Sequence, residues 1–74
     1  MNAITLHRID PARNMARFYA LDVQPDLFGC ILLVKAWGRI GGRGRIAHEL
    51  HTTEAQARAA LQRQAERKRR RGYQ

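Results

Sequence analysis

The stretch that decides the fold runs from residue 28 to residue 51 and reads FGCILLVKAWGRIGGRGRIAHELH. Its first part, from Phe28 to about Ile40, predicts a strand that starts apolar on both faces, as central strands do. Gly41-Gly42-Arg43-Gly44 predicts a turn, because glycine adopts positive φ without steric cost. Arg45 to about His51 predicts a strand that pairs back. The stretch therefore predicts a β-hairpin.

Two further strands are expected before this hairpin, at residues 3–9 and at about residues 16–23. A loop at 10–14 and a turn at 24–26 separate them, since Pro, Asp and Asn favour turns. Phe18 and Tyr19 are neighbours in a strand and so point to opposite faces. We expect Phe18 in the core and leave Tyr19 open.

A helix is expected from Thr52 or Thr53 to about Arg70, since Thr53 and Gln56 have the spacing of a capping box. Its apolar stripe is narrow and consists of Ala57, Ala60, Leu61 and Ala65. Gly72 ends it, and Tyr73 is expected to cover a sheet edge or the helix end. The sequence thus predicts one α+β domain over residues 1–74. We expect a four-stranded antiparallel sheet, one C-terminal helix packed across it, and a basic helix end and tail at 67–74.

Charge is the strongest compositional feature, with 14 Lys and Arg against 6 Asp and Glu. Twelve of the cations are Arg, which grips phosphate with two hydrogen bonds and stacks on flat rings. We therefore expect a polyanionic partner, nucleic acid above all.

No apolar run approaches the ~20 residues of a membrane span, and the first residues do not resemble a signal peptide. The single Cys30, expected in the core, fits a reducing compartment. We expect a cytoplasmic monomer.

Alternation along the predicted central strand places Lys35, Trp37 and Arg39 on one face, with Gly38 and Ile40 on the other. We expect Lys35, Trp37 and Arg39 to point outward as a working surface. Stacking of the indole on a base or sugar contributes ~1–3 kcal/mol with little sequence preference. The alternative, a Trp37 that serves only as a core residue, remains open.

More cations extend this surface. Arg39, Arg43 and Arg45 surround the predicted turn and are interpreted as a phosphate cradle. The run at 67–71, including Arg67 and Lys68, suits the negative end of the helix dipole. It is equally interpreted as a solvated tail or as a second phosphate contact.

Catalysis is not expected. His48-Glu49-Leu50-His51 has its histidines three apart in a predicted strand, which sends the rings to opposite faces rather than to one metal. No Ser is present to act as a nucleophile. We expect no metal site and no cofactor.

Trp37-Gly38-Arg39-Ile40-Gly41 resembles the signature of the WGR family, and other segments follow in the family's order. These are Asn14 before Ala16-Arg17-Phe18-Tyr19, Leu27-Phe28-Gly29, Thr53-Glu54-Ala55 and Lys68-Arg69-Arg70-Arg71-Gly72-Tyr73. WGR domains occur in poly(ADP-ribose) polymerases and in short bacterial proteins, as an antiparallel sheet with one helix.

The resemblance implies DNA binding at strand breaks, a setting in DNA repair, and roles for Trp37 and Arg39. Trp37 would pack on the sugar or base at a strand end, while Arg39 would contact the backbone or a neighbouring domain. ADP-ribosyl transfer is not implied, because the 74 residues do not resemble a transferase domain. Two hypotheses result: a nucleic-acid-binding module, or a protein-interaction module that docks an acidic partner.

Overall fold

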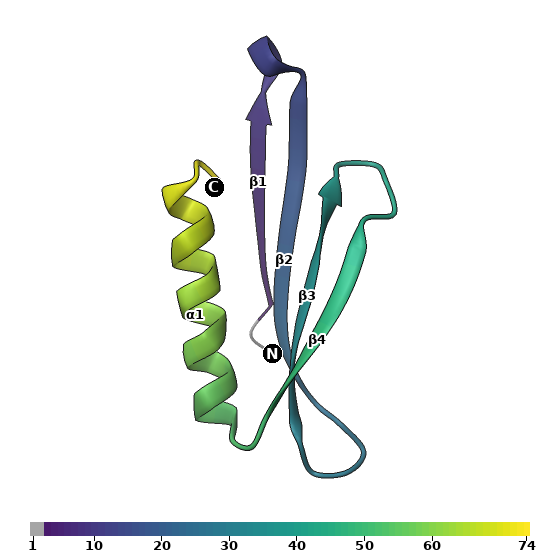
Figure 1. Ribbon diagram of the computed structural model, residues 1–74, viewed down its shortest axis with the longest axis vertical. Coiled ribbons are helices and arrows are strands. Elements are labelled where there is room, and N and C mark those ends of the chain that lie inside the picture. The colour runs from purple at the N-terminus through teal and green to yellow at the C-terminus, as the bar shows by residue number, and fades with distance from the viewer. Residues whose placement is uncertain (1–2) are drawn as a thin grey trace.

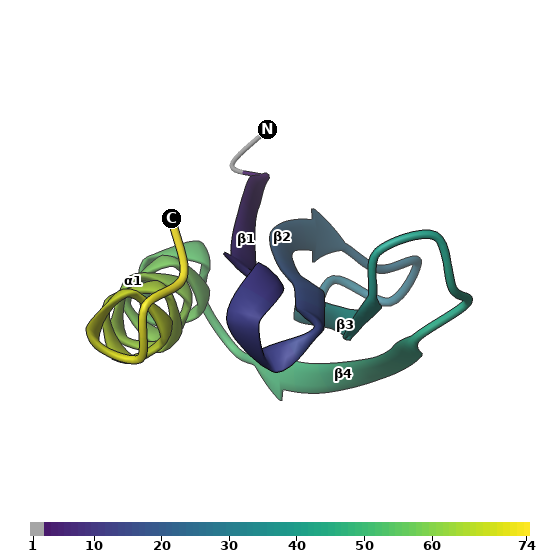
Figure 2. The same cartoon turned by 90° about the horizontal axis from the view of Figure 1, so that it is seen from above.

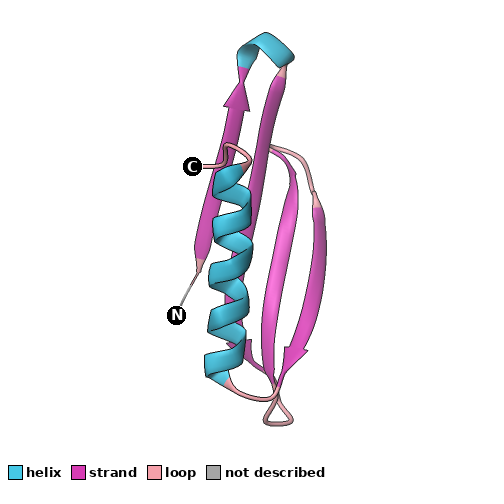
Figure 3. Ribbon diagram, turned by 60° about the vertical axis from the view of Figure 1, so that its left-hand side comes forward, coloured by secondary structure: helices cyan, strands magenta, loops and turns pink. Residues whose placement is uncertain are grey.

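The computed structural model describes residues 3–74, which form a curved antiparallel sheet with a helix lying over one face (Figures 1, 2 and 3). The strands pair in chain order: β1 (Ile4–Asp10), β2 (Met15–Pro25), β3 (Ile31–Arg39) and β4 (Arg45–His51). The helix α1 spans Glu54–Arg70. The predicted α+β class, with four antiparallel strands and one C-terminal helix, is confirmed.

The β2–β3 connection differs from the sequence prediction. β2 runs on to Pro25, and the chain turns at residues 26–30 instead of 24–26. Asp26 Oδ1 accepts hydrogen bonds from the backbone N–H groups of Phe28 and Cys30, both at 2.8 Å. An aspartate that binds nearby backbone in this way competes with strand pairing. Phe28 therefore lies exposed in the loop instead of starting β3, and Cys30 is half-buried instead of core.

The core lies between α1 and one face of the sheet, called here the helix side. Ala57, Ala60, Leu61 and Ala65 are the buried residues of α1, as the predicted stripe required. They pack against sheet residues that include Leu21 and Leu33. Thr53 caps the helix, its side chain accepting a bond from the backbone N–H of Gln56. The small alanines let α1 lie close to the strands.

The expectation for Phe18 is wrong. Tyr19 is the buried member of the pair, at 6% exposure, because Leu6 and Trp37 are its register partners on the helix side. Phe18 points to the opposite face, called here the open side, and its ring lies over Gly38 and Gly44. Strand alternation separates the two rings but does not tell which face the helix covers.

Gly38 and Gly44 permit this close approach. A Cβ on Gly44 would lie 2.4 Å from the carbonyl oxygen of Trp37, and one on Gly38 would lie 2.5 Å from the Cα of Gly44. No larger residue fits either place without moving backbone. The glycine of Trp37-Gly38-Arg39 thus brings the β3–β4 turn against the end of β3, which fixes the strand that carries Trp37.

The C-terminal residues close one edge of the sheet. His7 and Gln74 exchange two backbone hydrogen bonds of 2.8 Å on the outer edge of β1. Tyr73, 9% exposed, packs edge-on against Tyr19 with ring centroids 6.3 Å apart. Tyr73 was expected to cover a sheet edge or the helix end; its ring lies beside Lys68 in the last turn of α1 and covers Tyr19 on the inner strand β2. This tail anchors the end of α1 over the basic end of the helix side.

Candidate nucleic-acid interface

Three arginines stand in one row across the sheet. The register pairs Arg8 with Arg17, and Arg17 with Arg39, so the three side chains leave neighbouring strands on the helix side. Like charges directly opposite each other destabilise a sheet. No carboxylate within residues 3–74 lies within 4.0 Å of these guanidinium groups. Such a row is suited to an anion from outside the chain.

Trp37 occupies the next row of the sheet, between Tyr19 on β2 and Arg45 on β4. Its indole is half-buried and packs against the core, with its centroid 6.4 Å from that of Tyr19 and the planes 36° apart. Trp37 is therefore neither sealed in the core nor free in solvent. Part of the indole is supported by protein, and part remains available to a ligand.

The shared face of Lys35, Trp37 and Arg39 is confirmed, but it is not open surface. Leu21 and Tyr19, their register neighbours on β2, are buried under α1, so the helix covers this same face. The prediction of an outward surface is wrong in this respect. Trp37 and Arg39 lie at one end of the helix side, beside Lys68 in the basic last turn of α1.

Lys68 reaches over the sheet from that last turn. Its ammonium lies 4.6 Å from the ring centroid of Tyr19 and 5.5 Å from that of Tyr73. Burial lowers the pKa of Lys68 from its ordinary value, and the charges of Arg71, Arg17 and Arg67 lower it further. This crowding of positive charge shows a local potential that a bound phosphate would relieve.

Two hollows lie on either side of Trp37 and Lys68, which line both. The inner hollow, of about 280 Å³, lies between α1 and the sheet and reaches Lys35, Arg67 and Arg71. The outer hollow, of about 270 Å³, lies toward the strand ends and is lined by Arg17, Arg39 and Tyr73. We call the two together the basic groove. It combines an aromatic floor with cations on both walls.

Lys35 is already engaged by a carboxylate. Its ammonium lies 3.3 Å from Glu49 Oε2, and Glu49 Oε1 lies 2.7 Å from His51 Nε2. The hydrogen bond with His51, followed by the hydrogen bond and charge of Lys35, holds the pKa of Glu49 below its ordinary value. A phosphate can use Lys35 only in competition with Glu49, so Lys35 is a weaker contact than its position in the groove suggests.

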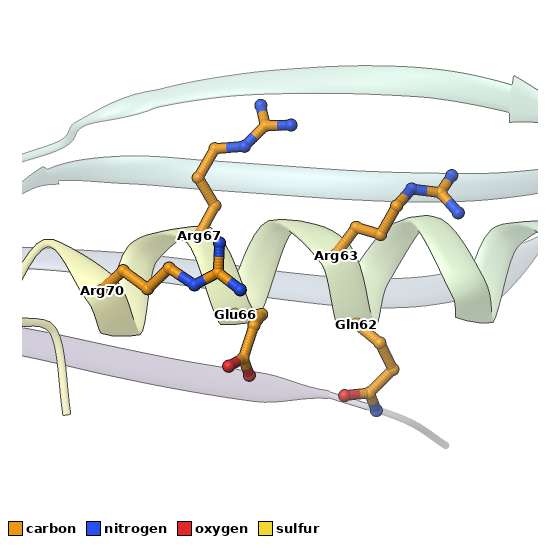
Figure 4. Close-up of a pocket in the computed structure, with 5 residues that line it drawn as sticks. All are labelled: Gln62, Arg63, Glu66, Arg67 and Arg70. Carbon is orange, nitrogen blue, oxygen red and sulfur yellow. The ribbon is translucent and has the colours of Figure 1, made fainter.

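The other predicted cations divide between the groove and its surroundings. Arg45 shares the row of Trp37 and Arg43 lies in the exposed turn, and neither of them lines a hollow of the groove. Arg67 lines the inner hollow and also a shallow hollow of about 450 Å³ along α1. Figure 4 shows Arg63 and Arg67 extending to one side of α1 there. That hollow is formed by flexible side chains of one helix and has no aromatic floor, so we do not assign it as the site.

The sequence prediction did not include Arg8 and Arg17. Arg17 stands two residues before Tyr19 and so shares its face, but the sequence leaves open which face that is. Arg8 required the register of β1 against β2, which the local sequence does not show. Arg71, in the predicted basic run at 67–71, lines the inner hollow.

The histidines do not assemble a metal site. His48 and His51 lie on opposite faces of β4, as predicted from their spacing. Within residues 3–74 no group of three or more His, Cys, Asp or Glu could hold a metal ion. No helix in the described part of the chain is long and apolar enough to cross a membrane.

Comparison with known proteins shows the family of the chain. The WGR domain family matches residues 2–74. The chain is also 45% identical over 69 residues to y4dW, an uncharacterized protein of Sinorhizobium fredii, a match that covers 92% of this chain. It spans 33% of that relative's length. No solved structure matches significantly. With Trp37, Gly38 and Arg39 placed at the end of β3, and with a family match over nearly its whole length, the chain belongs to the WGR domain family.

Proposed function

We propose that the chain is a non-catalytic module that binds nucleic acid in the basic groove, through backbone phosphates and the indole of Trp37. The observation that carries the proposal is the row of Arg8, Arg17 and Arg39, three like charges in register with no carboxylate partner in residues 3–74. Like charges in one row lower the stability of the sheet. Phosphate oxygens bound to the three guanidinium groups would offset this repulsion through charge-assisted hydrogen bonds.

Strand ends are the preferred target in this proposal. Trp37 is half-buried in the floor of the groove, with Lys68 above the neighbouring Tyr19. Inside a continuous duplex the base faces are stacked on one another, whereas the terminal nucleotide offers a free base face and an accessible sugar. The choice of DNA over RNA rests on the resemblance to the polymerase WGR domains.

Sequence preference should be weak, because the groove offers cations and an aromatic face and these recognise phosphates and stacking surfaces common to all sequences. The rival function is docking of an acidic protein segment in the same groove, which the charge also permits. A duplex end differs from an acidic peptide in offering a flat ring to Trp37.

The proposal is tested by fluorescence anisotropy with labelled blunt, nicked and overhanging duplexes, a closed circular competitor and a polyglutamate competitor, at several salt concentrations. We expect ends to bind more tightly than the closed circle. The affinity should fall steeply with salt, as counterion release requires. Arg17→Ala should weaken binding and lower the salt slope by about one unit.

Arg58→Ala is the matched control. It removes the same charge from the opposite half of α1, where Arg58 pairs with Glu54 at 2.8 Å, and should leave duplex binding nearly unchanged. If polyglutamate binds more tightly than the duplexes, and if Trp37→Ala leaves its affinity unchanged, docking of an acidic protein segment is the favoured function. No binding of any duplex tighter than millimolar at low salt would reject the proposal.

A further inference from the structure

The open side of the sheet differs sharply in charge from the helix side. The strands contain five cations, and the register puts all of them on the helix side: Arg8, Arg17, Lys35, Arg39 and Arg45. The open side of the four strands therefore carries no Lys or Arg. A chain with a formal net charge of +8 thus has one broad face free of fixed positive charge.

This open side is also apolar. Leu32, Val34 and Ala36 run along its centre on β3 and are half-buried. Ile46 and Leu50 on β4 are exposed, at 66% and 65%. Figure 3 shows α1 lying over one face of the sheet only, which leaves this face uncovered. Contiguous apolar patches of this kind are rare on soluble monomers and mark interaction sites.

The overlap between two such faces is small. A two-fold arrangement through β3 overlaps β2, β3 and β4 and leaves β1 outside. At about 4.8 Å per strand and about 3.4 Å per residue over the seven residues of β4, the overlap is roughly 14 Å by 24 Å. Two sheets packed face to face, with strands aligned within about 30°, form an ordinary sandwich. This overlap is below the roughly 800 Å² per partner of a standard protein interface and suits a dimer that dissociates on dilution.

The face is complementary to itself. One row of the open side consists of Asp22 on β2, Val34 on β3 and His48 on β4. Consider a two-fold axis that runs parallel to β3, between two open sides that face each other, and passes over Val34. This axis would place β2 of one copy over β4 of the other. Asp22 would then face the second copy's His48, and the pair would occur twice. The next row, Ala20-Ala36-Ile46, would set small Ala20 against large Ile46.

The carboxylate of Asp22 can take part in such a pair through its Oδ2. This oxygen accepts an exposed hydrogen bond from Gln24 Nε2 at 3.0 Å and has capacity for a further donor. An imidazole N–H of His48 from a facing copy would supply that donor. The other oxygen, Oδ1, is shielded from solvent by this chain and takes no part in the contact.

We infer that the open side is the dimer interface of this chain, and that its occupant is a second copy packed through the Asp22-Val34-His48 row. Self-packing on this face keeps the cations of the strands apart, because each sheet turns its basic groove away from the contact. A closed two-fold dimer of this kind carries two grooves on opposite outer surfaces. The inference does not depend on the proposed function, since the interface uses no residue of the groove.

Sedimentation velocity over a range of protein concentrations, without nucleic acid, tests the inference. The chain should change from monomer to dimer as its concentration rises. Val34→Lys should remove the dimer, because two ammonium groups would meet at the axis, while circular dichroism stays that of the folded chain. Thr5→Lys is the matched control: it adds the same charge to the same face on β1, outside the overlap of β2 and β4, and should leave the dimer intact.

Charge reversal tests the pairing itself. Asp22→Lys alone and His48→Glu alone should each weaken the dimer at least tenfold, and the double variant should recover most of that loss because the introduced ammonium and carboxylate then face each other. A chain that stays monomeric at every concentration overturns the inference. A dimer that survives Val34→Lys, or a double variant without recovery, overturns it as well.

Discussion

The two sides of one sheet are built by the same four strands and differ completely in chemistry. The helix side carries every Lys and Arg of the strands, together with the core under α1. The open side carries apolar residues with Asp22, His7 and His48, and no Lys or Arg. Alternation alone produces this division, since residues two apart share a face.

The face of the sheet that α1 covers also carries the basic groove. The helix side is divided along its length: Leu21 and Leu33 lie under α1, while Arg8, Arg17 and Arg39 lie toward the other end. Trp37 stands near the boundary, half in the core and half in the basic groove. Core packing thus positions the indole, and the charged end surrounds it with possible phosphate contacts.

The largest expected effect comes from removing two arginines of the row. Arg17→Ala with Arg39→Ala should weaken duplex binding about 100-fold at low salt, since each charge-assisted contact contributes ~1.5 kcal/mol. The salt slope should fall by about two units. Thermal stability should stay the same or rise, because like-charge repulsion is relieved.

The control for this pair is Arg58→Ala with Arg63→Ala, which removes the same charge from α1 outside the groove. Equal losses of affinity in both double variants would mean that net charge alone binds the duplex. The helix side would then hold no site.

Trp37→Ala should weaken binding to duplex ends about tenfold, within the ~1–3 kcal/mol of a stacking contact. Binding to a closed circular duplex should change little, because it presents no free terminal base. Anisotropy titrations with both substrates measure the difference, and thermal unfolding checks that the chain remains folded. Unfolding of the variant would show that Trp37 acts through the core alone.

Glu49→Gln should strengthen binding several-fold. The substitution removes the carboxylate that holds Lys35 at 3.3 Å and so frees this ammonium for phosphate. Glu66→Gln on α1 is the matched control, because it changes net charge equally away from the groove. Equal gains in the two variants would show that Lys35 makes no specific contact.

The smallest effect is a dependence on pH carried by Lys68. Burial and the nearby Arg71 lower the pKa of Lys68 below the ordinary value of 10.5. Its charge, and any phosphate contact it makes, should therefore be lost at a lower pH than for an exposed lysine. We expect affinity to fall a few-fold as pH rises toward 10.5. Lys68→Arg should remove that fall, because arginine stays charged; an unchanged profile would exclude Lys68 from the contact.

Local elements were predictable from the sequence because local residues determine them. The span of β4, the cap at Thr53 and the buried stripe of α1 all follow from alternation, capping and helical period. The turn at 26–30 was misplaced, because the hydrogen bonds of Asp26 end β2 later than the composition of Gln24-Pro25-Asp26 suggested.

The candidate site was only partly predictable, because its assembly depends on contacts between residues that are distant in sequence. Trp37, Arg39 and Lys35 share a face by alternation, but that α1 packs on this face depends on contacts distant in sequence. The expectation of Phe18 in the core leaves Arg17 and Tyr19 unassigned, although the register places both on the face of Trp37. The Arg8-Arg17-Arg39 row required the register across three strands.

The most direct test of the central claim is an NMR titration of the labelled chain with a short blunt duplex, following side-chain signals from both sides of the sheet. The account predicts shifts of the Trp37 indole N–H and of the Arg17 and Arg39 guanidinium signals. The methyl signals of Val34, Ile46 and Leu50 on the open side should stay in place. Shifts confined to those methyl groups, or a duplex that moves no signal of the basic groove, would contradict the claim that the helix side binds nucleic acid.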